Sequence, residues 1–138
     1  MKLLKLIICI ITIIIINPEI IKAEELDMED VDLLACVING EAGADYCSED
    51  MRYDVGSVVV NRLNHPMFPK TIKEVVYQEG QYGCTDSKYF VPEQHCRRIA
   101  IDILINGSRL PANVVFQSTE PLGSSVYIKE QNMYFCYI

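Results

Sequence analysis

The hydrophobic residues of this chain change their spacing once, and the change divides the sequence into a helical part and a strand part. Up to Asn106-Gly107, which is expected to end a helix with a left-handed cap, apolar residues recur every three or four positions. Beyond it they form short β-branched or aromatic runs separated by turn residues. The expected elements are four helices near residues 30–40, 48–63, 71–76 and 92–106, followed by three antiparallel strands at 114–117, 126–128 and 133–137. The sequence therefore predicts an α+β domain with a small sheet after the helices.

Local signals predict where the helices begin and end. Ser48 is a suitable N-cap, and Thr71 with Glu74 forms a capping box. Pro92 suits the first position of the fourth helix, because proline lacks the N–H that this position leaves unbonded. Gly40 is expected to end the first helix together with Gly43, so that Glu41 would lie between two glycines at a helix end.

The N-terminal segment has the pattern of a secretory signal. Lys2 and Lys5 precede an apolar run at residues 6–16, which is too short for the roughly 20 residues of a membrane-spanning helix. Ala23 is a small residue at a plausible cleavage point. The sequence predicts that residues 1–23 are a signal peptide and that 24–138 form one secreted, monomeric catalytic domain. An uncleaved membrane anchor is the alternative interpretation.

The charge of the chain excludes one class of partner. The formal net charge is −7, and removal of residues 1–23, which hold three lysines and one glutamate, changes it to −9. Nucleic-acid binding draws much of its affinity from neutralising phosphates with basic side chains. We therefore expect no nucleic-acid partner, and no membrane contact after the signal is removed.

Five cysteines remain after the signal, and an exported protein is expected to pair them. They are Cys36, Cys47, Cys84, Cys96 and Cys136. The favoured bridge joins Cys47 to Cys84, because both flank the loops expected to form the site, and Cys84–Cys96 is nearly as favourable. An odd number leaves at least one thiol free. Neither a C-x-x-C motif nor histidines at metal-ligand spacing is present, so no metal or other cofactor is expected.

The residue types leave a carboxylate acting as a general acid as the best catalytic candidate. Glu41 follows the apolar face of the first helix, and the adjacent glycines permit close approach of a ligand. A carboxyl group held against apolar neighbours can keep its proton and donate it near neutral pH. A solvated helix-end acid without function is the alternative for Glu41. A cysteine nucleophile beside His65 or His95 is a weaker possibility, because exported cysteines are commonly bridged.

Several short strings occur in an order and spacing that resemble a known family. They are residues 34–43 (LACVINGEAG), 55–62 (VGSVVVNR), 68–72 (FPKTI), 75–82 (VVYQEGQY), 113–117 (NVVFQ) and 134–137 (YFCY). Together they are similar to the SleB-type cell wall hydrolases, which include the spore cortex-lytic enzymes of germination. The resemblance covers roughly residues 30–138. The loop at residues 45–48 and the cysteine content depart from the spore members, so action on vegetative wall or in a phage stays open beside action on spore cortex.

The resemblance implies a lysozyme-like fold and a peptidoglycan substrate. It also implies that Glu41 is the single catalytic acid and that the β-1,4 bond between N-acetylmuramic acid and N-acetylglucosamine is cleaved. Cortex-lytic members are lytic transglycosylases that leave 1,6-anhydro-muramyl ends. A muramidase is the alternative, and it would require Asp45, Asp54 or Asp86 across the cleft. A non-catalytic secreted wall-binding module is the alternative from another class.

Four residues are predicted to contact the sugar. Gln81 and Tyr82 lie in a glycine-flanked loop that suits hydrogen bonding and ring stacking, and Gln117 and Tyr134 lie on expected strands that could line a cleft. Asn61-Arg62, at the end of the second helix, is instead expected to have a structural role.

Overall fold

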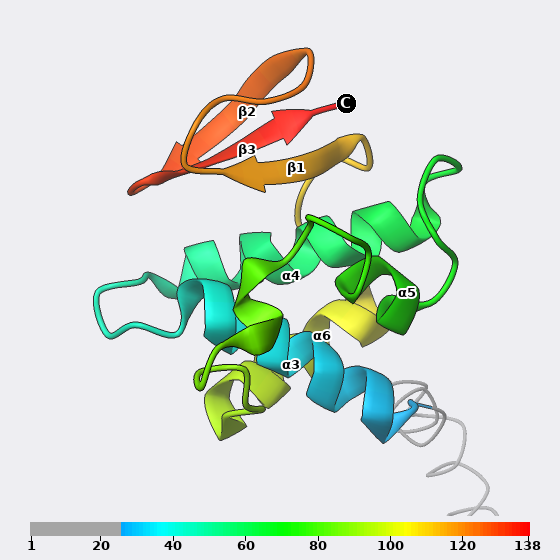
Figure 1. Ribbon diagram of the computed structural model, residues 1–138, viewed down its shortest axis with the longest axis vertical. Coiled ribbons are helices and arrows are strands. Elements are labelled where there is room, and N and C mark those ends of the chain that lie inside the picture. Colours follow the sequence, from blue (N-terminus) through cyan, green and yellow to red (C-terminus); the bar gives the residue numbers. More distant parts are fainter. Residues whose placement is uncertain (1–25) are drawn as a thin grey trace, which may run out of the picture.

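The computed structural model describes residues 26–138, so the predicted signal peptide at residues 1–23 lies outside the described part of the chain. The element order is α3 (Met28–Ala42), α4 (Glu49–Asn64), α5 (Ile72–Val76), a 3-10 helix η1 (Gly83–Asp86), α6 (Gln94–Asn106), β1 (Val114–Ser118), β2 (Ser125–Glu130) and β3 (Met133–Tyr137) (Figure 1). The predicted α+β class, with four α-helices before a small antiparallel sheet, is confirmed. No helix within residues 26–138 has the length and apolar character needed to cross a bilayer.

Side-chain caps begin three of the helices. Ser48 Oγ accepts a hydrogen bond from Met51 N at 3.0 Å, as the sequence predicts for the start of α4. Thr71 Oγ1 accepts from Glu74 N at 3.2 Å, so the predicted N-cap is confirmed, while the Glu74 carboxylate accepts from the Thr71 hydroxyl at 2.8 Å and not from the backbone N–H that a full capping box would use. Asp27 caps α3 by accepting from the backbone N–H of Glu29.

Two predicted helix boundaries are wrong, the start of α6 and the end of α3. Pro92 is not the first residue of α6, because backbone hydrogen bonds from Val91 N to Tyr89 O and from Glu93 N to Val91 O keep this segment in tight turns. Gly40 does not end α3, which continues through Glu41 to Ala42 and is capped by a bond from Gly43 N to Asn39 O. Glu41 therefore lies in the last helical turn.

The three strands form an antiparallel sheet in the order β1-β3-β2. The last strand of the sequence is thus the central one, and its neighbours pair with it on both edges. Gln131, with φ of 53°, forms the turn between β2 and β3. Gly107 ends α6 at the predicted position and with a positive φ of 93°, but its ψ of 175° is extended and not that of the predicted left-handed cap. β2 is longer than the predicted strand, because Ser125 and Glu130 at its two ends also pair with β3.

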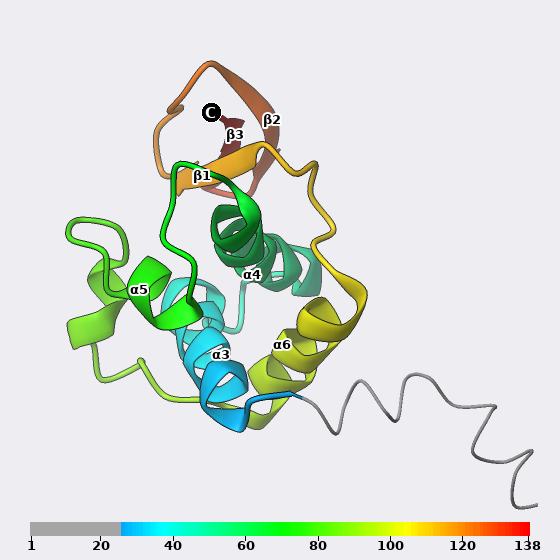
Figure 2. The ribbon, with the colours of Figure 1, turned by 90° about the vertical axis from the view of Figure 1, so that its right-hand side faces the viewer.

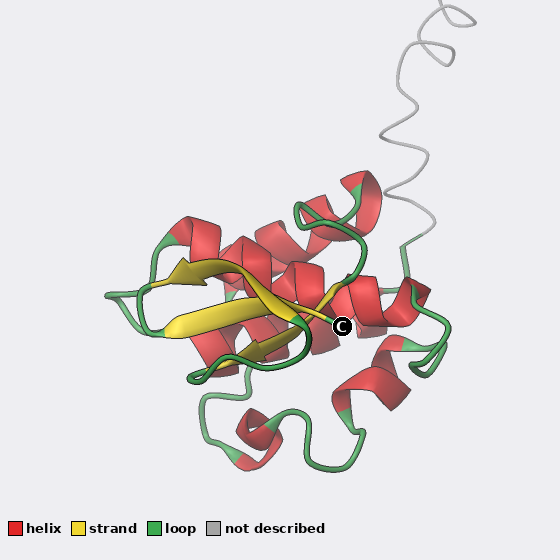
Figure 3. Ribbon diagram, turned by 90° about the horizontal axis from the view of Figure 1, so that it is seen from above, coloured by secondary structure: helices red, strands yellow, loops and turns green. Residues whose placement is uncertain are grey.

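Helix α4 lies between the sheet and the other helices. In Figures 1 and 2 the sheet lies on one side of α4, and α3 and α6 lie on the other. Figure 3, seen from above, shows the sheet spread over the helical layer. Gly56 lets the helices approach, since a Cβ there would lie 2.6 Å from Ile103 Cδ1 of α6 and 3.0 Å from Ile38 Cδ1 of α3. The core extends through this contact to Phe135 of β3, which is fully buried.

The sheet is tied to the end of α4 by Asn61 and Arg62. Asn61 Nδ2 donates to Pro111 O at 2.8 Å and to Val114 O at 2.9 Å, and Arg62 Nε donates to Val115 O at 2.6 Å. Both side chains are buried. The expected structural role of Asn61-Arg62 is therefore confirmed, and the consequence is that β1 passes close to the helical layer.

Candidate active site

Glu41 lines a cavity of about 350 Å³ at the end of α3. The helix ends one residue later, at Ala42, and the Glu41 side chain is only partly exposed. The lining residues come from α3, from the segment before α4 and from the loop before α6, and they are Asn39, Gly40, Glu41, Gly43, Ala44, Tyr46, Cys47 and Tyr89. Glu41 is the only acidic residue in this lining. The cavity is thus a place where one carboxyl group could meet a ligand.

Gln117 of β1 is the predicted sugar-binding residue that contacts Glu41. Its Nε2 donates a long hydrogen bond of 3.5 Å to Glu41 Oε2, across 76 positions of sequence. Gln117 Oε1 is buried and has no hydrogen-bond partner among the described residues. The amide nitrogen of Gln117 therefore faces one carboxylate oxygen of Glu41.

Tyr82 lies behind this pair and is 4 % exposed. The Arg62 guanidinium lies between two rings, 5.2 Å from the centroid of Tyr82 and 5.3 Å from that of Phe68. Burial raises the pKa of Tyr82 to about 12; the charge of Arg62 opposes the shift and that of Glu41 adds to it. The Tyr82 hydroxyl is a neutral donor near Glu41 with no hydrogen-bond partner within residues 26–138.

The other two predicted sugar-binding residues lie elsewhere. Gln81 is exposed and lines a different cavity, of about 310 Å³, formed by residues 76–83, 85 and 86. Tyr134 lies on the central strand β3 opposite Ser118, with the Lys129 ammonium 4.8 Å from its ring centroid. The structure therefore brings Gln117 into contact with Glu41, but none of the four predicted sugar-binding residues lines the Glu41 cavity, and Tyr82 lines the other cavity together with Gln81.

Cys84 contacts Glu41, a relation that the sequence did not predict. Burial, followed by a hydrogen bond to Glu41, raises the pKa of the Cys84 thiol well above its usual range. A Cβ on Gly40 would lie 2.7 Å from Cys84 Cβ and 2.9 Å from its Sγ, so only glycine at position 40 admits this approach. The glycine that precedes Glu41 therefore indicated that another residue packs closely at this point, although the sequence did not identify that residue as Cys84.

The predicted disulfides are not formed in this structure. Cys36, Cys47, Cys84, Cys96 and Cys136 are all free and buried. Cys84, the shared member of both favoured bridges, instead packs its sulfur against Gly40 and Glu41. Cys96 Sγ lies 3.2 Å from His95 Nε2. Tertiary packing thus engages these thiols with other groups, which loop length alone could not predict.

Arg52 of α4 holds the segment that follows Glu41. Its Nε donates to Ala42 O at 2.9 Å and its Nη2 donates to Ala44 O at 3.1 Å. On the other rim, Asn39 Nδ2 donates to Tyr89 O at 2.9 Å. These bonds hold three backbone carbonyl groups around the cavity, so its shape depends on side chains that the sequence did not single out.

The acids proposed for a muramidase do not line the Glu41 cavity. Asp54 lies on α4, where burial and then the charges of Glu130 and Asp50 raise its pKa to about 6. Asp86 lines the cavity of Gln81, and Asp45 is exposed in the turn before α4. The described residues contain no group of three or more His, Cys, Asp or Glu side chains placed to hold a metal ion. The site as described offers acid–base chemistry from one carboxyl group.

Comparison with known proteins gives one match. A family model described as Cell Wall Hydrolase matches residues 48–134, which is more than half of the chain. The matched residues include Gln81, Tyr82, Gln117 and Tyr134, and they begin after Glu41. No curated protein and no solved structure matches the chain.

Proposed function

The chain belongs to the cell wall hydrolase family, whose substrate is peptidoglycan, and on that premise we propose that it is a lytic transglycosylase with Glu41 as its acid. The bond broken is the β-1,4 link between N-acetylmuramic acid and N-acetylglucosamine. The observation that carries this proposal is that Glu41 is the single carboxylate lining its cavity. A hydrolase of the usual type needs a second carboxyl group roughly 5 to 9.5 Å away to act as base or nucleophile.

The reaction needs one group that gives and then takes a proton. Protonated Glu41 donates its proton to the glycosidic oxygen as the bond from that oxygen to the muramyl anomeric carbon breaks. The muramyl 6-hydroxyl then attacks the anomeric carbon and forms the 1,6-anhydro ring. Its proton passes to the Glu41 carboxylate, which restores the acid. No water is consumed, so the enzyme needs no second carboxylate to activate one.

The neighbours of Glu41 support this role. Gln117 donates to one oxygen of Glu41 and so orients the carboxyl group. The Tyr82 hydroxyl is buried near Glu41 without a hydrogen-bond partner among the described residues, and the residue lines the neighbouring cavity with Gln81. Gln81 and Tyr134 would contact sugar units farther along the strand. We place the reaction outside the cell, in wall or spore cortex, with export directed by residues 1–23.

Digestion of purified peptidoglycan tests the proposal. Protein expressed from the full-length sequence is compared with Glu41→Gln, which keeps the side-chain shape and removes the acid. Glu120→Gln is the matched control, because Glu120 is exposed after β1, away from the cavity. Mass spectrometry of fragments should show 1,6-anhydro-muramyl ends from wild type and control, and a loss of about a hundredfold or more in Glu41→Gln.

Other outcomes each identify a different function. Fragments with reducing muramyl ends would establish a muramidase in place of a transglycosylase. Anhydro products that persist in Glu41→Gln would assign the chemistry to another carboxyl group. Binding to sacculi without release of fragments, equal in wild type and Glu41→Gln, would favour a wall-binding module.

A further inference from the structure

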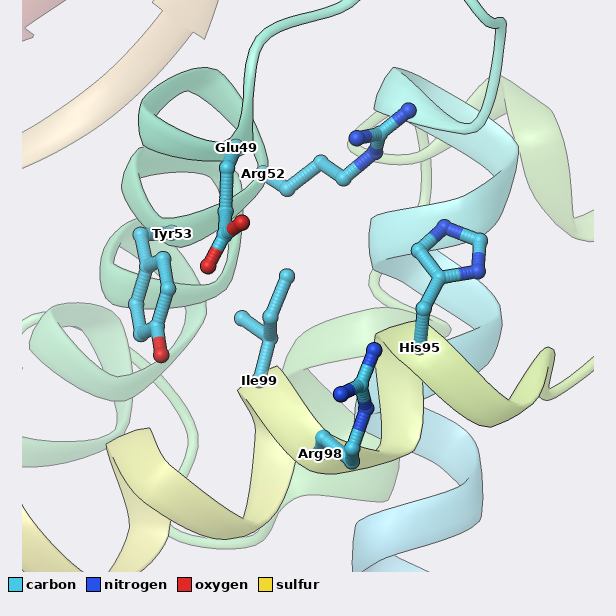
Figure 4. Close-up of a pocket in the computed structure, with 6 residues that line it drawn as sticks. All are labelled: Glu49, Arg52, Tyr53, His95, Arg98 and Ile99. Atoms are coloured by element: carbon cyan, nitrogen blue, oxygen red, sulfur yellow. The ribbon is translucent and has the colours of Figure 1, made fainter.

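A second depression lies between the first turns of α4 and α6, away from the cavity at Glu41. Its volume is about 450 Å³. Figure 4 shows its lining, which we call the α4–α6 pocket and which consists of Glu49, Arg52, Tyr53, His95, Arg98 and Ile99. A neighbouring depression shares His95 and Arg98 and extends the surface past Gln94 to Glu93. The two together form a polar groove along the start of α6.

The pocket gathers basic groups in a chain that is acidic overall. The net charge of the protein is −7, yet two arginines and a histidine line this one pocket. The Arg98 guanidinium is exposed and makes no hydrogen bond or ion pair with any residue in the range 26–138. By contrast, the adjacent Arg97 forms a salt bridge with Asp32, with 2.6 Å between Nε and Oδ1. Arg98 therefore has its full set of donors available to an anionic group.

The orientation of the other two basic side chains is held by the protein. His95 Nε2 lies 3.2 Å from Cys96 Sγ, and its other ring nitrogen has no partner among the described residues. Arg52 uses Nε and Nη2 to bind backbone carbonyl groups, which leaves Nη1 without a partner in that part of the chain. A planar guanidinium and a held imidazole suit a carboxylate, because each can donate in the plane of its oxygens.

The pocket also carries a negative group and an apolar surface. Figure 4 shows the Glu49 carboxylate and the Ile99 side chain directed into the same space as Arg98 and His95. The exposed carboxylate of Glu49 would attract an ammonium group and would repel a polymer that carries only negative charges. Tyr53 and Ile99 are mostly buried, and they add a small apolar part to the wall of the pocket. The chemistry that fits is a short peptide bearing both carboxylate and ammonium groups.

Arg52 connects this pocket to the cavity at Glu41. Its guanidinium binds Ala42 O and Ala44 O, and the segment 43–47 lines the Glu41 cavity on the other side. The two depressions are therefore separated by one turn of chain. A glycan strand whose muramyl unit lies at Glu41 carries its peptide on that same sugar unit, so the peptide would begin beside this segment.

We propose that the α4–α6 pocket binds the stem peptide of peptidoglycan, with a peptide carboxylate on Arg98 and His95 and the free ammonium of its diamino acid on Glu49. This inference rests on the proposed function in one respect, namely that the substrate is a peptidoglycan strand. It makes the enzyme selective for muramyl units that still carry peptide.

Calorimetric titration with the synthetic tripeptide L-alanyl-γ-D-glutamyl-meso-diaminopimelate tests binding without any catalytic step. Wild-type protein should bind it, and Arg98→Ala should bind about tenfold more weakly, as loss of a hydrogen bond to a charged group implies. Glu49→Gln should also weaken binding. Lys73→Ala is the matched control, since it removes one exposed positive charge on α5 and should leave the Kd unchanged.

Two results of the titration would overturn the proposal. One is equal tripeptide affinity in wild type and Arg98→Ala. The other is binding of poly(glycerol phosphate) in preference to the tripeptide, which would make the pocket a site for wall phosphodiesters. Circular dichroism of each variant shows whether a loss of binding comes from misfolding, and Arg98→Lys, which keeps the charge, should recover part of the affinity.

Cleavage rates separate this proposal from the proposed function. The rate ratio between peptide-bearing strands and strands stripped of peptide by an amidase should exceed one in wild type and in Lys73→Ala. It should fall toward one in Arg98→Ala. A ratio of one in wild type would overturn the stem-peptide site while leaving glycan cleavage established. Absence of cleavage on both substrates would refute the proposed function, and the titration would still decide whether the pocket binds peptide.

Discussion

At the scale of single residues, the environment of Glu41 is built from parts that are distant in sequence. Gln117 comes from β1 and Cys84 from η1, and both contact the same carboxyl group. Gly40 permits this by leaving space for Cys84 beside the helix. Glu41 could be singled out from the residues next to it in the sequence. The residues that contact it depend on which other segments the fold brings to the end of α3.

The Gln117 amide gives a prediction at this scale. Gln117→Ala removes the hydrogen bond to Glu41 Oε2 and frees the carboxyl group to rotate, so kcat should fall about tenfold with little change in KM. Turbidity loss of a sacculi suspension measures both constants. Thr119→Ala, two residues farther along and exposed, is the control and should behave as wild type. A rise in KM at constant kcat would show instead that Gln117 binds sugar without orienting Glu41.

At the scale of elements, α4 is the helix on which the others are assembled. It contacts α3, α5, α6 and β1, and its close approach to α3 and α6 requires Gly56. Its start was predictable because the cap is a bond within the first turn of the helix itself, between Ser48 Oγ and Met51 N. The start of α6 was not, because Glu93 supplies no side-chain cap and the turns around Pro92 depend on the preceding loop.

Asp54 on α4 gives a pH-dependent prediction. Burial, with the charges of Glu130 and Asp50, raises its pKa from 3.8 to about 6, so the folded state holds this proton more tightly than the unfolded state. Its ionisation therefore destabilises the fold progressively as the pH rises from about 4 to 6. Asp54→Asn should increase the free energy of unfolding at pH 7 and leave it unchanged below pH 4.

Urea unfolding at pH 3.5 and pH 7 measures this difference. Asp45→Asn is the control, because Asp45 is exposed before α4 and should show no gain at either pH. A gain for Asp54→Asn of the same size at both pH values would contradict an ionisation effect and indicate a change in packing.

At the scale of the whole molecule, the junction between sheet and helices positions the site. Gln117 reaches Glu41 because β1 is held against the end of α4, and the holding contacts are the bonds of Asn61 and Arg62 to carbonyl groups of residues 111, 114 and 115. The sheet has little other attachment to the remaining helices, since α4 is the helix with the substantial contact to β1. A weakened junction would therefore move Gln117 away from Glu41.

Asn61→Ala tests this junction. The substitution leaves two carbonyl groups, Pro111 O and Val114 O, without their donor, and the second bond is buried. Unfolding free energy should fall by about 2–4 kcal/mol. Hydrogen exchange in β1 should accelerate more than in α3, and activity should decline as well.

Asn64→Ala, at the exposed end of the same helix, is the control and should change none of these quantities. If exchange in Asn61→Ala accelerated equally in β1 and α3, the substitution would have lowered the stability of the whole fold and not of the junction.

The sequence by itself determined the features that depend on neighbouring residues. The α+β order, the caps at Ser48 and Thr71 and the helix end at Gly107 follow from local hydrogen bonding and apolar periodicity, and the structure confirms them. Glu41 was singled out by its string of residues, and its catalytic role stays a prediction. Only the tertiary structure decided that Gln117, 76 positions away, faces Glu41, that Cys84 is unbridged beside it and that Arg52 holds the segment after it. These contacts join separate elements, and their partners are chosen by packing around α4, which no local pattern encodes.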